Sequence, residues 1–214
     1  MKLKTQKMKQ IILTLTLLTM VLGMEGCTVR DFFASEPGEL LTLVPKTVRL
    51  DMLDYYDSGT IVQANNNMGS GTQLDTVTDN FLRLRTSDVK TLEMRLMRWK
   101  NDTIIAVVET VETPVKDSHI TFYNKHWVRL KEIKPFKMPT IEDFILPTVK
   151  KDKRKEILTG IAFPLIELSF GGPNFEELTA RHGLAKFLGK EEWAKLKPYF
   201  RPTLTYRVQN GKIK

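Results

Sequence analysis

The sequence predicts an α+β fold in which antiparallel β-meander sheets carry helices packed on one face. The first observation is that residues 60–131 contain consecutive short segments of alternating apolar and polar side chains, separated by turn residues. Such segments are typical of an antiparallel meander. The second observation is that the apolar period becomes helical before residue 60 and in two charged segments after residue 149. A length of 214 residues permits one domain or two small ones.

Residues 30–58 are expected to be helical, with breaks at Pro37-Gly38 and at Pro45. Asp31 is expected to cap a short helix before the first break. The segment VRLDMLDYYD is the clearest helix, and Thr47 just before it is of a residue type that favours the N-cap position. Its apolar residues recur at i, i+4, i+7 and i+8, which places them on one helix face: Val48, Met52, Tyr55 and Tyr56.

The strands of the meander differ in how strongly their residues favour the sheet. NFLRLRT and TLEMRLMRWK alternate apolar and charged residues and are expected to pair as a hairpin. TIIAVVETV is rich in β-branched residues, which predicts a strand in the interior of the sheet. HITFY and HWVRL, joined by Asn124-Lys125, are expected to complete the meander.

The C-terminal part is expected to begin after a proline-containing connector, residues 132–148, with one short helix around IEDFI. We expect a charged helix at 150–162, the strands PLIELSF and FEELTARHG, and a helix in KEEWAKLKPYF. Asn210-Gly211 favours the type I′ turn of a terminal hairpin.

The predicted organisation is a signal peptide at residues 1–26, an N-terminal α+β subdomain at 27–131, the connector at 132–148 and a C-terminal α+β subdomain at 149–214. Each half has a helix, then an alternating strand, and ends in a hairpin, which suggests two related tandem subdomains. Two unrelated hairpins are the competing interpretation, because short alternating segments resemble one another by chance.

Residues 1–26 have the three parts of an export signal. MKLKTQKMKQ is positively charged, the next 14 residues are almost all apolar or threonine, and a short segment ending in Gly26 precedes Cys27. The apolar run is short for a bilayer span, which needs about 20 residues. A retained anchor and a buried helix are the competing interpretations.

Cys27 is the only cysteine, so the chain cannot form an internal disulfide. Two interpretations of its position stay open. In a bacterial lipoprotein, the cysteine after a small residue receives the lipid, and Gly26 satisfies that position. In ordinary signal cleavage, Cys27 would be a free thiol near the mature N-terminus. We expect lipidation, because a lone cysteine at this boundary is hard to explain by packing near a mature terminus, which is usually poorly ordered. The acyl chains would then tether the protein stably to a membrane.

Composition and motifs exclude several classes of function. The net charge of +8 falls to +5 without residues 1–26, because that segment contains four lysines and one glutamate. This surplus is too small to indicate a nucleic-acid partner. The sequence has no phosphate loop, dinucleotide fingerprint or HExxH motif, so we expect no cofactor and no metal. Asp51, Asp54 and Asp57 are expected to form a solvated helix face rather than a calcium site.

The strongest candidate for binding is a basic sheet face at the predicted hairpin. If NFLRLR pairs with TLEMRLMRWK, five cations are expected to share one face, with Trp99 at its end: Arg83, Arg85, Arg95, Arg98 and Lys100. Such a face could hold an anionic glycan, a lipid headgroup or an acidic partner. A solvated face partly balanced by Glu93 is the competing interpretation.

Three parts of the sequence resemble an uncharacterised family of exported proteins from Bacteroidales. They are Phe32-Phe33, the segment PGELLTLVP and the run Arg49-Leu50-Asp51-Met52-Leu53-Asp54; PLIELSF and KPYFRPTLTYR resemble the C-terminal part of the family. The resemblance spans most of the mature chain. It implies export but no catalytic residue.

We therefore expect an exported envelope protein, periplasmic or anchored to the membrane as a lipoprotein. Its expected function is non-catalytic binding of a protein, peptide or glycan. The alternative is a periplasmic or surface hydrolase with a site assembled from distant residues, and a third interpretation is a structural spacer. An enzyme should bring Asp, His or Ser side chains together in a pocket. A binding module should show a broad exposed patch or an open sheet edge.

Overall fold

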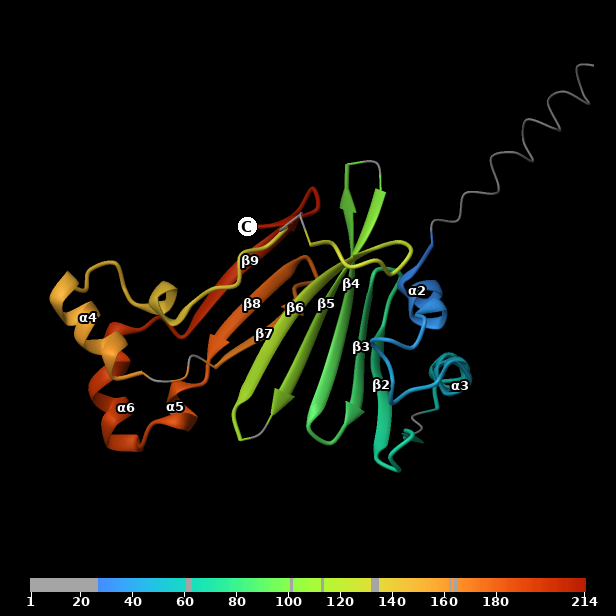
Figure 1. The fold of residues 1–214 in the computed structure, drawn as a ribbon, viewed down its shortest axis with the longest axis horizontal. Helices are drawn as coiled ribbons and strands as arrows, with labels where there is room; N and C mark the ends of the chain where they lie inside the picture. Colours follow the sequence, from blue (N-terminus) through green and yellow to red (C-terminus); the bar gives the residue numbers. More distant parts are fainter. Residues whose placement is uncertain are drawn as a thin grey trace, which may run out of the picture.

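The computed structural model describes residues 27–214 apart from 61–62, 101, 113, 132–134, 162 and 164. The expected signal peptide lies outside the described residues. The described chain has the predicted α+β fold, with two antiparallel sheets (Figure 1). Its first half contains these elements: α2 (Val29–Ser35), α3 (Lys46–Asp57), β1 (Ala64–Asn65), β2 (Gly71–Val77), β3 (Phe81–Ser87), β4 (Lys90–Trp99), β5 (Asp102–Glu112) and β6 (Lys116–Asn124).

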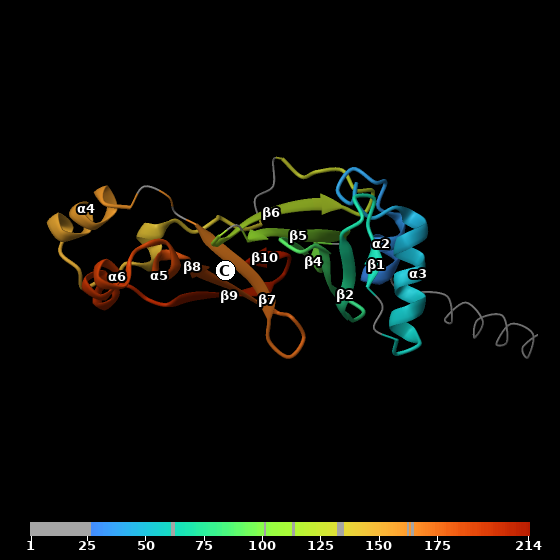
Figure 2. The ribbon, with the colours of Figure 1, turned by 90° about the horizontal axis from the view of Figure 1, so that it is seen from below.

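The second half contains short helices between and around four strands. Its elements are these: η2 (Ile141–Phe144), α4 (Lys151–Thr159), β7 (Ile166–Gly171), β8 (Glu177–His182), α5 (Leu184–Phe187), α6 (Lys190–Leu196), η3 (Lys197–Tyr199), β9 (Thr203–Gln209) and β10 (Lys212–Ile213). The molecule is elongated, with α2 and α3 at one end and α4, α5 and α6 at the other (Figures 1 and 2).

The six-stranded sheet is a meander in the sequence order β1-β2-β3-β4-β5-β6. β4 and β5 pair without interruption from Lys90↔Val111 to Trp99↔Asp102. The expectation that TIIAVVETV lies inside the sheet is confirmed, because β5 pairs with β4 and β6. Its residues from Ile104 to Val108 are all buried, as expected for a strand covered on both faces.

Helices α2 and α3 cover one face of this sheet. Phe33, which is fully buried, and Met52 pack from the helices into a cluster with Leu84, Met94 and Ile105 of the strands. Figure 2 shows the two helices stacked at the end of the molecule against the strands. The prediction of helices on one sheet face is therefore confirmed for the N-terminal half.

The four-stranded sheet, in the order β10-β9-β8-β7, covers the opposite face. Phe81, Ala106 and Phe122 of the first sheet share one hydrophobic cluster with Leu168 and Leu178 of the second. The core between the sheets therefore contains residues from both sides of the predicted connector. Burial of this apolar surface away from water is the main force that holds the two halves together.

Side chains of the first sheet also bind the outer edge of β7. Three backbone N–H groups of β7 point to this edge, away from β8, because they belong to alternate residues of the strand. Their hydrogen bonds run from Ile166 to the Asp117 carboxylate (3.2 Å), from Leu168 to the Ser118 hydroxyl (2.9 Å) and from Phe170 to the Glu93 carboxylate (2.7 Å).

The expectation of a helix in GELLTLVP is wrong, because residues 36–45 form bends and turns. A buried ion pair holds this loop against α3. Arg49 donates to the Glu36 carboxylate at 3.1 Å and to the Glu36 carbonyl at 2.7 Å, and both side chains are at most 2% exposed. The same carboxylate accepts the N–H groups of Gly38 and Leu40. These tertiary bonds replace the helical bonds of the segment.

Two helix starts and one strand differ from expectation. α3 begins at Lys46, and its N-cap residue is Pro45 rather than the expected Thr47. α2 begins after Thr28, and Asp31 completes its capping box from inside the helix. The expected strand HWVRL is reduced to a single bridge, Tyr123↔Arg129, beside which the Leu130 N–H donates to the Phe122 carbonyl at 2.8 Å.

In the C-terminal half the expected helices and strands are present, and α5 is an addition. Asn210 and Gly211 both have positive φ, as a type I′ turn requires. Helices α5 and α6 lie between β8 and β9, whereas α2 and α3 precede β1, so the order of elements differs between the halves. The duplication and the boundaries at 131/132 and 148/149 remain predictions.

Candidate functional site

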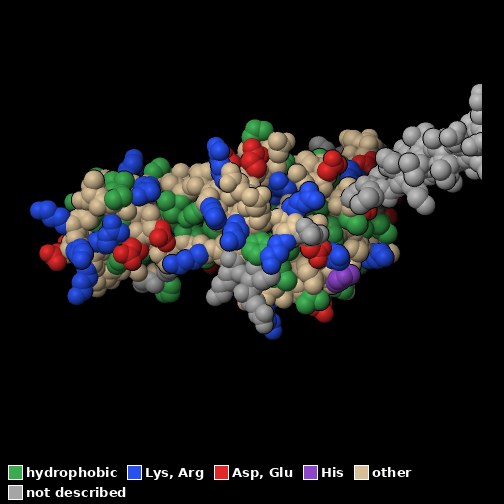
Figure 3. Space-filling model, turned by 90° about the horizontal axis from the view of Figure 1, so that it is seen from above, with side chains coloured by type: hydrophobic (Ala, Val, Ile, Leu, Met, Phe, Trp, Pro, Cys, Tyr) green, Lys and Arg blue, Asp and Glu red, His purple; other side chains and the backbone are tan. Residues whose placement is uncertain are grey.

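A basic pocket lies where the end of β4 meets the turn between β9 and β10. We call it the junction pocket, and its volume is about 400 Å³. Figure 3 views the side of the molecule that is uppermost in Figure 1, where these turns lie, and shows many Lys and Arg side chains across its middle. The lining residues come from both sheets: Arg95, Leu96, Met97, Arg98, Lys100, Val208, Asn210 and Gly211.

The pocket forms because β4 extends past β3, its neighbour on one side. The pairing of β3 with β4 reaches only Arg95, so residues 96–99 project beyond it. The turn at Gly211 packs directly against this projecting segment. A Cβ added to Gly211 would lie 2.6 Å from the Arg98 carbonyl oxygen and 2.9 Å from the Trp99 Cα, and its φ is +72°. Only glycine fits this contact.

The residues that line the junction pocket include three cations and no carboxylate. Arg95 is fixed in place, since its Nε donates to the Phe175 carbonyl at 2.8 Å and its Nη1 to the Leu96 carbonyl at 2.6 Å. Burial lowers the pKa of Arg95, and Glu176 opposes that shift. An arginine nevertheless stays charged at neutral pH. Arg98 and Lys100 are exposed at the mouth.

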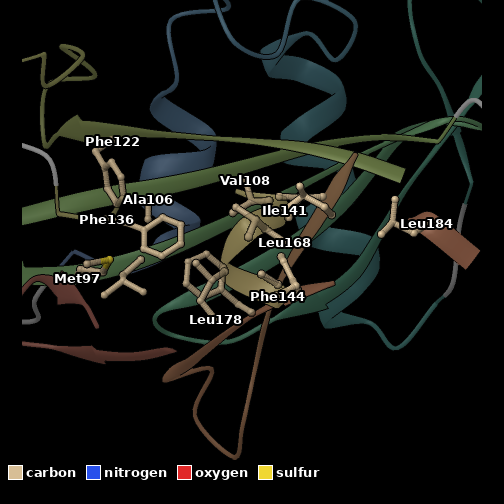
Figure 4. Packing of buried hydrophobic residues seen from close by; sticks show 14 of the residues in the cluster. Met97, Ala106, Val108, Phe122, Phe136, Ile141, Phe144, Leu168, Leu178 and Leu184 are labelled. Carbon is tan, nitrogen blue, oxygen red and sulfur yellow. The ribbon is translucent and has the colours of Figure 1, made fainter. Parts of the chain in front are cut away.

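Apolar atoms complete the wall. Met97 points into the core between the sheets, beside Ala106 and Phe122 (Figure 4). The Nζ of Lys212 lies 6.0 Å from the ring centroid of Trp99, within the range of a cation–π interaction. Lys212 thus adds a cation next to the pocket. The sequence offers no signal for Lys212 other than the turn before it.

The structure separates the five cations that were expected to share one solvated face. Arg83 bonds Glu93 between the two sheets, and Arg85 lies 3.5 Å from the Asp75 carboxylate. Arg98 is three positions from Arg95 on a regular strand and therefore points to the opposite face. The junction pocket still brings together Arg95, Arg98 and Lys100, beside Trp99, because it lies around the end of the strand rather than on one face. Their predicted binding role remains a prediction.

Glu93 is a buried carboxylate that serves the sheet interface. It accepts bonds from Arg83, from the Ser169 hydroxyl at 3.0 Å and from the Phe170 N–H at 2.7 Å. Burial raises the pKa of Glu93, and Arg83 and these hydrogen bonds act against the shift. Arg83 belongs to the first sheet, and Ser169 and Phe170 belong to the second, so the carboxylate fixes how the two sheets pack.

The three histidines lie apart from one another. His119 and His126 are exposed on β6 and in the turn after it. His182 is surrounded by the rings of Phe144, Trp193 and Phe200. Within the part of the chain that is described, no group of three or more His, Cys, Asp or Glu side chains is placed to hold a metal ion.

Cys27 is exposed and immediately precedes the residue that caps α2. The N–H of Val29 donates to the Asp79 carbonyl at 2.8 Å, which fixes the start of the fold against the turn between β2 and β3. No helix among residues 27–214, as far as they are described, is both long and apolar enough to cross a membrane.

Comparisons with known proteins identify the family. Residues 21–213 match the family described as "Protein of unknown function (DUF3256)", and the chain belongs to that family. A solved structure, described as a domain of an uncharacterized protein from Porphyromonas gingivalis W83, is similar to this fold. Its TM-score is 0.73 at 26% sequence identity, and the match covers 87% of this chain and 96% of that chain. A search of curated proteins gave no match.

Proposed function

We propose that this protein is a non-catalytic binding module of the cell envelope, and that it binds an anionic group of a protein, peptide or glycan in the junction pocket. The observation that carries the proposal is the charge of the pocket. Arg95, Arg98 and Lys100 line a space of about 400 Å³ that no carboxylate lines. This volume lies in the range of pockets that hold small ligands.

The arrangement suits an anion attached to a larger molecule. The guanidinium group of Arg98 offers planar pairs of donors that match carboxylate, sulfate and phosphate oxygens. Arg95 adds a positive charge, while its Nε and Nη1 donate to backbone carbonyl groups. Leu96 and Val208, which are partly buried, supply apolar surface for the part that carries the charge. Arg98 and Lys100 are exposed to solvent, so a polymer can bind by one unit while the rest stays in solvent.

Isothermal titration with sulfated and carboxylated oligosaccharides, and with an acidic peptide, tests the proposal. Arg98→Gln and Lys100→Gln together are expected to weaken binding at least about tenfold, because each charge-assisted hydrogen bond contributes about 1.5–3 kcal/mol. Arg85→Gln is the matched control, since Arg85 pairs with Asp75 outside the pocket. Equal loss in the control, or no binding of any anion, would contradict the proposal.

The envelope assignment extends to a lipid on Cys27. Its support is the pattern of residues 1–26 and the exposure of Cys27 just before the first helix. The intact mass of the protein purified from membranes should include the acyl chains. A Cys27→Ser variant should be released into the soluble fraction at high salt, which screens attraction to anionic lipids, and its retention in the membrane under that condition would contradict lipidation.

A further inference from the structure

We infer that the face containing the junction pocket lies against an anionic membrane surface, with the exposed cations of this face beside the phosphates of lipid headgroups. The inference rests on the proposed function, because the cations that would bind an anion in the pocket are the ones that would face the membrane. Two observations carry it: the position of Cys27 relative to the pocket, and the charge of the face that both share.

Cys27 lies close to the junction pocket through a short chain of contacts. The N–H of Val29, two residues after Cys27, is bonded to the Asp79 carbonyl at 2.8 Å. The next carbonyl, that of Asn80, accepts the Leu96 N–H at 2.8 Å and the Arg95 Nη1 at 3.3 Å. Leu96 and Arg95 line the pocket. A lipid on Cys27 would therefore hold this side of the molecule at the bilayer.

The start of α2, next to Cys27, and the turns that form the junction pocket lie on the same side of the molecule. In Figure 1 the start of α2, the turn after β4 and the turn after β9 all lie toward the upper side of the molecule. Figure 3, viewed from that side, shows basic side chains across the middle with a few acidic ones among them. Helices α4 and α6 lie at the far end, away from the start of α2.

The charges around the pocket favour an anionic surface. Arg98, Lys100 and Lys212 have no ion-pair partner among the described residues. Nearby Lys125 is different, because Asp102 lies 3.4 Å from its Nζ. Each Lys or Arg close to an anionic membrane contributes about 1 kcal/mol of attraction. These three cations would therefore orient the tethered protein with its pocket toward the headgroups.

The opposite end of the molecule provides a matched control. Lys150, Lys151 and Lys155 are exposed at and after the start of α4. Replacing these three lysines changes the net charge as much as replacing the three cations of the junction face. A general attraction of a basic protein to anionic vesicles would respond equally to both sets. The proposed orientation predicts a response to the junction set alone.

The test uses the chain that begins at residue 27 and carries Cys27→Ser, which retains every described helix and strand but cannot be acylated. Its flotation is measured with phosphatidylcholine vesicles that contain about one third phosphatidylglycerol, and with pure phosphatidylcholine. We expect binding to the anionic vesicles only. The variant Arg98→Gln/Lys100→Gln/Lys212→Gln should bind on the order of 100-fold more weakly, at about fivefold per charge.

The control variant Lys150→Gln/Lys151→Gln/Lys155→Gln should bind the anionic vesicles within about twofold of the unsubstituted chain. Equal weakening in the two triple variants would overturn the inference. Titration with inorganic phosphate and a sulfated oligosaccharide separates the two proposals. Binding of these soluble anions without vesicle binding would overturn the membrane orientation and leave the proposed function standing. Absence of binding to soluble anions and vesicles alike would overturn both.

Discussion

The Glu93 carboxylate accepts the N–H of Phe170 at 2.7 Å across the interface between the two sheets. The two residues are far apart in the sequence, and one belongs to each half of the chain. The other carboxylate oxygen accepts bonds from Arg83 and Ser169. A hydrophobic interface alone is non-directional, so these bonds fix where β7 lies on the first sheet.

Glu93→Ala should therefore destabilise the protein strongly. The substitution leaves the Phe170 N–H without its acceptor at a buried site and removes the carboxylate that pairs with Arg83. The expected loss in the free energy of unfolding is about 3 kcal/mol. Urea unfolding followed by circular dichroism measures it. Glu109→Ala is the control, because the Glu109–Lys90 pair is partly exposed and should contribute less than about 1 kcal/mol. Equal losses would refute the role of Glu93.

Gly211→Ala should separate the β9–β10 turn from β4. Alanine is strained at a φ of +72°, and its Cβ would lie 2.6 Å from the Arg98 carbonyl oxygen. We expect a loss of about 2 kcal/mol in unfolding free energy and weaker anion binding in the junction pocket. Gly189→Ala is the matched control, because a Cβ there has nothing within 4 Å and φ is negative. If Gly211→Ala kept full stability, the close packing of the turn would be disproved.

Arg49→Met should destabilise the loop at 36–45. Arg49 and Glu36 are almost fully buried, so the substitution leaves a carboxylate that only backbone N–H groups satisfy. The expected cost is about 3 kcal/mol by chemical unfolding. The double variant Arg49→Met/Glu36→Gln should recover part of that loss, because it removes the uncompensated charge. A double variant less stable than Arg49→Met would show that the charge is not the cause.

His182 should make stability depend on pH. Burial among aromatic rings lowers the pKa of His182 below its ordinary value of 6.5, although the Arg201 carbonyl opposes the shift. The unfolded chain therefore binds a proton at a higher pH than the folded chain. Stability should fall as the pH drops below about 6.5 and level off below the folded-state pKa.

The comparison of unfolding at several pH values with His182→Phe tests this expectation. The variant cannot titrate at this position, so its stability should change less between about pH 7 and pH 5. His119→Gln is the control, because His119 is exposed on β6. The charged residues that line a small pocket with His182 are of both signs: Lys116, Glu167, Arg181 and Lys186. An unchanged pH profile in His182→Phe would contradict the assignment.

Local patterns predicted the elements of this fold better than the way they pack. Alternation in NFLRLRT and TLEMRL correctly predicted paired strands, because a half-buried strand needs only local period. The same pattern could not show that a second sheet would cover the Arg83 face. Glu93 was the available signal, since it is registered directly opposite Arg83. Arg49 was similarly hidden, because a buried arginine requires an acceptor from a distant loop.

The candidate site was predicted in part. The pocket does bring together Arg95, Arg98 and Lys100, beside Trp99. The cause is the extension of β4 past β3, which the alternation of apolar and polar residues does not predict. Gly211 lies in a turn that the sequence predicts well. No local pattern indicates that this turn would pack against Arg98. The contacts that form a pocket between two sheets depend on tertiary packing.

The side-chain bonds along β7 have a consequence for how this protein behaves at high concentration. A strand at the margin of a sheet usually offers unpaired N–H groups, which can recruit a strand of another molecule and begin aggregation. At Ile166, Leu168 and Phe170 these donors are already taken by side chains of the first sheet. Blocking this edge would keep neighbouring copies of the protein from polymerising through β7 wherever the local concentration is high.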